Sequence, residues 1–241
     1  MKRFLKNELL MIFCALACCI GVESKEIRPS VYGEVAIIDL VAELLSDHPV
    51  FVQAGAYPEV LKRLFFLRPG AKAYIFEPNL DYLQIPQYQQ RVEVFPWALS
   101  KESQKALFYL SKPPVNPHLG SLLPAESGWN WYYSDEEQRV VECKNLQEWA
   151  SERGVLQIDC LWLNAGGSEL DILKSIPEFI DRVQVVFVEA YEQKFREGCA
   201  LFEEIKGFLA DHDLELLQRW NVQNFQGYAV FMKKGLAEVV K

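Results

Sequence analysis

Histidine is scarce in this chain of 241 residues, and most of the sequence has little cysteine. The three histidines are far apart and show no metal-ligand spacing. Three of the six cysteines fall near the N-terminus. The others are too widely spaced for a zinc site, and their odd number does not suit a disulfide framework. We therefore expect no metal, and we expect these remaining cysteines to be small buried hydrophobic residues: Cys143, Cys160 and Cys199.

Positive charge is also under-represented. The chain has 25 lysines and arginines against 33 aspartates and glutamates, which gives a formal net charge of −8. This balance disfavours nucleic acid as a partner, because non-specific binding depends on clustered lysine and arginine. The dinucleotide-binding pattern G-x-G-x-x-G is absent as well. The length suits one domain, and 50% hydrophobic residues are enough for a large core.

The N-terminal segment differs from the rest of the chain. Lys2, Arg3 and Lys6 precede an apolar run over residues 9–22, as in a secretory signal. The run is shorter than the roughly 20 residues that span a bilayer. We predict a signal peptide or membrane-anchor-like segment at 1–24, with possible membrane association, followed by one domain at 25–241. A buried or interfacial N-terminal helix, or a later start site, is the alternative.

Strands alternate with helices along the body. Apolar runs predict strands at 50–54, 73–76, 92–95, 105–110, 140–143, 158–163, 183–189, 214–220 and 228–233. Helical spacing predicts helices at 31–45, 59–67, 80–85, 146–153, 168–175 and 201–212. This alternation indicates a doubly wound α/β domain, with a mostly parallel sheet and an antiparallel last pair at its edge. Residues 113–133 are irregular and aromatic, which favours either a lid over a ligand or a hydrophobic cluster beneath a loop.

Ligands of such sheets bind at the carboxyl ends of strands. Glu77 follows the second predicted strand, 22 residues after Gly55 in the first turn. Considered alone, Glu77 would be interpreted as a solvated strand-end carboxylate. With Gly55 at the matching first turn, a carboxylate that accepts hydrogen bonds from a ribose diol is the favoured interpretation. Glu59 occupies the first turn of the next helix, where its charge would repel phosphate. A ligand with ribose and no phosphate, such as S-adenosylmethionine (SAM), therefore fits better than a dinucleotide.

Four stretches, read in order, resemble a known family. They are "VFVQAGAYPEV", "AYIFEPNLDYL", "LWLNAGGSELDILKSI" and "VVFVEAYEQ", supported by "FPWALSKES", "LGSLLP" and "KNLQEWASERGV". From about residue 50 to 233 the chain resembles the FkbM-type SAM-dependent methyltransferases. The resemblance implies a Rossmann-like fold with a seven-stranded, mostly parallel sheet, and SAM as cofactor. It also implies methyl transfer to oxygen on a small molecule or glycan.

The resemblance assigns roles to particular residues. It implies that the cofactor contacts Gln53, Gly55, Ala56, Tyr57, Glu77, Pro78, Asn79 and Ala98. It makes Asn164, Glu169 and Glu189 the candidates for catalysis, while Glu169 could instead favour a helix N-terminus.

Four residues depart from the family pattern. Gln53 and Asn164 stand where the family has aspartate, and Glu59 replaces a glycine. Tyr57 replaces a small polar residue, and it could either stack on a ligand or fill the space that the ligand would need. Asparagine can hydrogen-bond but cannot act as a base. The alternative function is therefore a catalytically inactive binding protein with the same fold, possibly exported. Dependence on SAM favours the cytoplasm and the N-terminus favours export. Neither the acceptor nor an oligomeric state follows from these residues.

Overall fold

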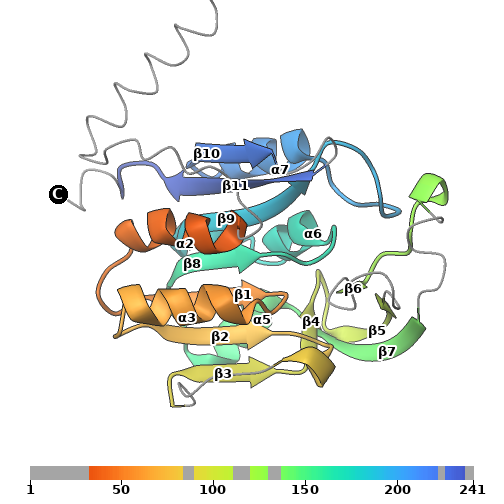
Figure 1. The fold of residues 1–241 in the computed structure, drawn as a ribbon, viewed down its shortest axis with the longest axis horizontal. Coiled ribbons are helices and arrows are strands. Elements are labelled where there is room, and N and C mark those ends of the chain that lie inside the picture. Colours follow the sequence, from red (N-terminus) through yellow and green to blue (C-terminus); the bar gives the residue numbers. More distant parts are fainter. Residues whose placement is uncertain (1–32, 84–89, 111–119, 130–136, 222–225, 237–241) are drawn as a thin grey trace, which may run out of the picture.

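The computed structural model describes residues 33–83, 90–110, 120–129, 137–221 and 226–236. Its centre is a seven-stranded sheet with the order β10-β11-β9-β8-β1-β2-β3 (Figure 1). β3, β2, β1, β8 and β9 run parallel, and β11 is antiparallel to both β9 and β10. The strands are β1 (Val50–Ala54), β2 (Lys72–Phe76), β3 (Val92–Phe95), β8 (Ile158–Leu163), β9 (Val183–Tyr191), β10 (Leu214–Asn221) and β11 (Gln226–Lys233).

Helices cover both faces of this sheet. One core contains residues of α2 (Gly33–Glu43) and α3 (Pro58–Leu67). The opposite core contains residues of three further helices: α5 (Leu146–Arg153), α6 (Glu169–Lys174) and α7 (Phe202–Ala210). Because both faces are covered, every residue of β8 is buried, which explains its continuous apolar sequence. The predicted doubly wound domain with an antiparallel last pair of strands is confirmed.

A second sheet, which the sequence analysis missed, lies beyond the carboxyl ends of β1, β2 and β3 (Figure 1). Its strand order is β4-β7-β5-β6. The strands 105–110 and 140–143 were predicted, but their pairing into a separate sheet was not. The members are β4 (Trp97–Leu99), β5 (Gln104–Leu110), β6 (Gly120–Ser121) and β7 (Glu137–Lys144).

The buried face of α2 differs from the predicted one. Hydrophobic spacing placed Val31, Val35, Ile38, Ala42 and Leu45 on one side, and the last three are buried. Val35 is partly exposed, and Val31 lies outside the described residues. The structure buries Ile37, Val41 and also Glu34. The buried face of α2 is therefore rotated relative to the predicted one, and it includes a carboxylate.

Two other predictions need correction or fall outside the description. The helix expected at 80–85 is a single 3-10 turn, η1 (Leu80–Tyr82), and residues 84–89 are not described. Of the aromatic segment, Trp129 ends the 3-10 helix η2 (Ser127–Trp129) and packs against Tyr191 and Phe195. The remaining 3-10 helix is η3 (Ile180–Arg182).

The segment predicted as a leader, residues 1–24, lies outside the described residues, as do Trp131, Tyr132 and Tyr133. Within the described part of the chain, none of the helices has the length and apolar character that a membrane span requires. Cys143, Cys160 and Cys199 are free and buried, as expected.

Candidate cofactor and active site

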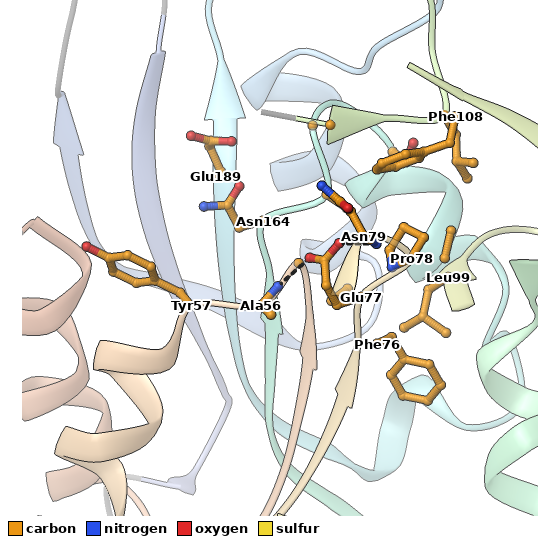
Figure 2. A pocket seen from close by; sticks show the side chains of 18 of the residues that line it. Ala56, Tyr57, Phe76, Glu77, Pro78, Asn79, Leu99, Phe108, Asn164 and Glu189 are labelled. Carbon is orange, nitrogen blue, oxygen red and sulfur yellow. Dashed lines mark hydrogen bonds between the residues drawn. The ribbon is translucent and has the colours of Figure 1, made fainter. Parts of the chain in front are cut away.

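A cavity of about 650 Å³ opens at the carboxyl ends of β1, β2, β8 and β9. Figure 2 shows the side chains around it. Its lining includes most of the residues that the sequence assigned to the site: Gly55, Ala56, Tyr57, Glu77, Pro78, Asn79, Ala98, Asn164 and Glu189. A cavity of this size can hold a cofactor, because ligand sites commonly enclose about 300–1,000 Å³.

The turn after β1 is built around Gly55. Its φ is +79°, a conformation that favours glycine. Its N–H donates to the Phe76 carbonyl over 3.0 Å, and the Asn164 N–H donates to the Ala54 carbonyl over 3.0 Å. A Cβ at Gly55 would lie 1.9 Å from the carbonyl oxygen of Asn164. Glycine is therefore needed here so that the ends of β1 and β8 can approach each other.

Glu77 connects the turn after β1 with the turn after β2. Its Oε2 accepts a hydrogen bond from the Ala56 N–H over 2.9 Å, and its Oε1 accepts one from the Asn79 N–H over 2.7 Å (Figure 2). Burial raises the pKa of this carboxyl group, and the two backbone hydrogen bonds oppose that shift. Each carboxylate oxygen can accept further hydrogen bonds, so the chemistry of Glu77 would suit a pair of hydroxyl groups.

An apolar wall lies beside Glu77. Pro78 follows it directly, and Leu99 and Phe108 come from the second sheet. Ala98, also in β4, adds a small side chain to this wall. The second sheet therefore supplies the side of the cavity on which a flat apolar group such as adenine could pack.

Two buried acids form a second polar region of the cavity, its acidic side, separate from Glu77. One of them is Glu34, which the sequence analysis did not select. Glu34 is 7% exposed and lines the cavity. Its Oε2 accepts from the Trp162 indole N–H over 3.0 Å, and its Oε1 accepts from the Asn164 amide over 2.9 Å. Burial and the nearby Glu189 raise the pKa of Glu34 to about 8.

Glu189 is the second buried acid on this side, at 6% exposure. It accepts hydrogen bonds from the Tyr191 hydroxyl and from the Gln226 amide. Burial raises its pKa, and these hydrogen bonds lower it in part. The pKa of the neighbouring Tyr228 hydroxyl is also raised, first by burial and then by the charge of Glu189. A carboxyl group of raised pKa thus lies at the cavity wall.

Two of the predicted site residues do not line the cavity. Gln53 is fully buried within β1, beside Ile75 and Trp162 of the neighbouring strands. Glu169 is 1% exposed, and its Oε1 accepts from the N–H groups of Ala165 and Gly167 over 2.8 and 3.3 Å. Burial, with a contribution from Glu189, raises the pKa of Glu169 to about 8. Glu169 therefore stabilises the loop after β8 through hydrogen bonds to its backbone.

Tyr57 and Glu59 leave the space beside Glu77 open. In Figure 2 the Tyr57 ring points away from Glu77, and it packs against the core under α2 and α3. The Glu59 carboxylate is 48% exposed and lies 3.5 Å from the Lys62 ammonium. The two replacements in the first turn therefore do not fill the part of the cavity that Glu77 faces.

Comparison with known proteins identifies the family. The sequence model described as "Methyltransferase FkbM domain" matches residues 53–216. This chain belongs to the FkbM methyltransferase family. The 2-O-methyltransferase NoeI of Sinorhizobium fredii is 25% identical to it over 193 residues, which cover 73% of this chain and 76% of NoeI.

Two solved structures are also similar to this chain. Precorrin-6y C5,15-methyltransferase from Geobacter metallireducens is 14% identical, with a TM-score of 0.46 and coverage of 88% of this chain and 93% of that one. An O-methyltransferase family protein from Burkholderia thailandensis is 12% identical, with a TM-score of 0.41 and coverage of 83% and 57%.

The family match confirms the resemblance read from the sequence. Together with the order of the seven strands, it makes this FkbM domain a Rossmann-like SAM-methyltransferase fold, as expected. Membership implies SAM as the cofactor, and the residues present fit such a molecule. Glu77 suits a ribose diol, the wall of Pro78 and Leu99 suits an adenine ring, and the acidic side suits a cation. Within the described ranges, no group of three or more His, Cys, Asp or Glu side chains could hold a metal ion.

Three polar cavity residues that sequence reasoning missed lie outside the matched segment. Glu34 precedes residue 53, and Gln226 and Tyr228 follow residue 216. Only Glu34 carried a signal, since a glutamate within an apolar stripe of α2 marks a buried polar position. Gln226 and Tyr228 face the cavity because β11 pairs with β9, which is a long-range contact.

Proposed function

We propose that this FkbM-family protein transfers a methyl group from SAM to an oxygen atom of a small-molecule or glycan acceptor. The observation that carries the proposal is the position of Glu77, fixed by two backbone hydrogen bonds in a cavity at the strand ends. The relationship to a 2-O-methyltransferase supports oxygen as the atom that receives the methyl group.

Bound SAM would supply an electrophilic methyl group on a sulfonium, which passes in line to the acceptor oxygen. Glu77 would hold the ribose hydroxyls. Ala98, Pro78 and Leu99 would contact the adenine, and Gly55 and Ala56 would let the backbone approach the cofactor. The chain's main contribution is to fix the two reactants relative to each other, since orientation can supply much of the rate enhancement of such a displacement.

Glu189 is the group best placed to take the acceptor's proton. It lines the cavity, whereas Glu169 does not. As the acceptor oxygen forms its bond to the methyl carbon, its O–H proton would move to a carboxylate oxygen of Glu189. A raised pKa makes the ionised form of this carboxylate a stronger base than an exposed one. Asn164 has no basic group, and its amide nitrogen already donates to Glu34.

Two measurements test this function. Isothermal titration calorimetry with SAM and with S-adenosylhomocysteine measures cofactor binding. Transfer of radiolabelled methyl groups to panels of sugars, glycolipids and phenols then measures activity. Absence of heat and of any thermal shift at millimolar SAM would contradict the proposal.

A non-catalytic protein with the same fold is the second candidate. It is favoured by the replacement of two acids, because Gln53 is enclosed in the core and Asn164 cannot act as a base. Tight binding of SAM without transfer to any acceptor in the panel would favour this second function over the first.

A further inference from the structure

One of the two acids on the acidic side of the cavity comes from a helix that lies outside the residues matched by the family model. Glu34 lies in the first turn of α2, before the matched residues 53–216. Its two carboxylate oxygens are held by Trp162 in β8 and by Asn164 just after β8. The position of the Glu34 carboxylate is therefore fixed relative to the turn at Gly55, which the Asn164 backbone contacts directly.

Within the described ranges, no basic side chain pairs with the Glu34 carboxylate. Among the residues that the structure describes, the groups that affect its ionisation are Glu189, Trp162 and Asn164, none of which is a cation. The two basic residues on the cavity wall have other partners. Lys62 lies 3.5 Å from Glu59, and Arg196 donates to the Leu123 carbonyl over 3.2 Å. A buried carboxylate without a cation is costly, and a positively charged ligand would offset that cost.

The residue at the usual place of the first-turn acid cannot take this role. Gln53 is uncharged, fully buried and absent from the cavity wall. Its neighbours in the sheet, Ile75 and Trp162, belong to the core under α2 and α3. Glu34 approaches the cavity from that same side, through α2. The Glu34 carboxylate, which comes from α2, could therefore take the place of the aspartate that the family has at the position of Gln53 in β1.

We propose that Glu34 binds the ammonium group of the methionine part of SAM. The ammonium is the partner because it donates hydrogen bonds to a carboxylate, which a sulfonium cannot do. The Glu34–Asn164 pair then acts as one unit in which glutamate carries the charge and asparagine holds it in place. This inference rests on the proposed function, since it concerns the same cofactor.

The decisive variants are Glu34→Gln and the double variant E34Q/N164D. Glutamine keeps the size of Glu34, and rotation of the Asn164 amide can present its oxygen to the new amide group. The double variant restores one carboxylate to the pair of residues 34 and 164, now at position 164. Glu43→Gln is the matched control, because Glu43 lies at the exposed end of the same helix. Circular dichroism and thermal unfolding check that each variant is folded.

Calorimetry with three ligands locates the contact. SAM and S-adenosylhomocysteine both carry the ammonium, and 5′-methylthioadenosine carries only the nucleoside part. We expect E34Q to weaken the binding of SAM and of S-adenosylhomocysteine by a similar factor, roughly tenfold to hundredfold. The affinity for methylthioadenosine should not change. We expect E34Q/N164D to recover most of the lost affinity and Glu43→Gln to match the wild type.

The outcomes separate this inference from the proposed function. If the wild type binds neither SAM nor methylthioadenosine, both ideas fail. If the wild type binds SAM and E34Q binds it equally well, only the role of Glu34 is overturned. A loss confined to SAM would place Glu34 at the sulfonium and refute the ammonium contact. Equal loss of all three ligands, or no recovery in the folded double variant, would mean that Glu34 acts through the shape of the cavity.

Discussion

The Glu77 carboxylate accepts a hydrogen bond from the backbone N–H of Ala56 over 2.9 Å, and this bond joins the ends of β2 and β1. The same side chain accepts from the Asn79 N–H over 2.7 Å. Glu77 thus both shapes the two turns and presents its remaining lone pairs to the cavity. A residue with two such functions can be tested by separating the negative charge from the hydrogen bonds.

The first prediction concerns Glu77. Glu77→Ala removes the acceptor of both backbone N–H groups as well as the ribose contact. We expect SAM to bind roughly tenfold to hundredfold more weakly, because hydrogen bonds to a charged group contribute about 1.5–3 kcal/mol. Glu77→Gln keeps one acceptor oxygen and should show an intermediate loss by calorimetry. The exposed Glu102→Gln serves as the control, and unchanged affinity in Glu77→Ala would remove Glu77 from the site.

The second prediction concerns Gly55. Gly55→Ala places a Cβ 1.9 Å from the Asn164 carbonyl oxygen in a backbone conformation with φ of +79°. We expect a loss of stability of about 2–4 kcal/mol in urea unfolding, together with loss of SAM binding.

Gly154→Ala is the matched control for this change. Gly154 has a similar φ of +63°, but nothing lies within 4 Å of its added Cβ. The Gly154→Ala variant should lose only about 1–2 kcal/mol of stability, because alanine is disfavoured in the left-handed conformation. Equal losses in the two variants would contradict the predicted clash between β1 and β8.

The third prediction concerns pH. Glu34 and Glu169 have a pKa of about 8 in the folded chain, against an ordinary value of 4.5. Between these values the folded state binds more protons than the unfolded state, so stability should fall as pH rises from about 5 to 8. Burial is the main cause for both groups, and the charge of Glu189 adds to it.

Glu169→Gln tests the pH dependence, because the glutamine oxygen can still accept from Ala165 and Gly167. The slope of unfolding free energy against pH should become shallower, and stability at pH 8 should rise by on the order of 1–3 kcal/mol. The exposed Glu178→Gln should leave the slope unchanged. A slope that is equally steep in Glu169→Gln and the wild type would show that Glu169 ionises normally.

Local sequence signals were enough to predict most of the main sheet. Val50–Ala54 and Leu146–Arg153 have the predicted bounds, because a short apolar run and a capped amphipathic helix are encoded within the segment itself. Asn145 caps that helix by accepting from the Glu148 N–H, and Gly154 ends it with a positive φ.

The second sheet could not be predicted in the same way. In this sheet Glu142 of β7 lies opposite both Lys105 of β5 and Trp97 of β4. β7 is distant in the sequence from both of these strands, so their pairing is not encoded locally. Nothing local to Trp97–Leu99 specifies a partner strand.

In the candidate site, too, some residues could be placed from local sequence signals and others depend on long-range contacts. Glu77, Asn79 and Gly55 follow strands, so their meeting at one sheet edge could be predicted. Gln53 follows the same logic but is enclosed by the core, because its side chain points to the face that α2 and α3 cover. Glu34 could not be placed, because only the docking of α2 on the sheet brings it to Asn164.

The last prediction concerns Glu189 and the methyl-transfer step. Glu189→Gln keeps a group that can bind the Tyr191 hydroxyl but cannot accept a proton. With an acceptor identified, we expect kcat to fall by about 10²–10⁴-fold, the usual contribution of a general base, while affinity for S-adenosylhomocysteine changes little.

The pH profile then distinguishes a base from a positioning residue. Wild-type activity should rise with pH as the Glu189 carboxyl loses its proton, and burial places this rise above the ordinary pKa of a glutamate. The rise should be absent in Glu189→Gln and retained in the exposed Glu197→Gln. If Glu189→Gln keeps the wild-type profile and most of kcat, the acceptor's proton leaves by another route.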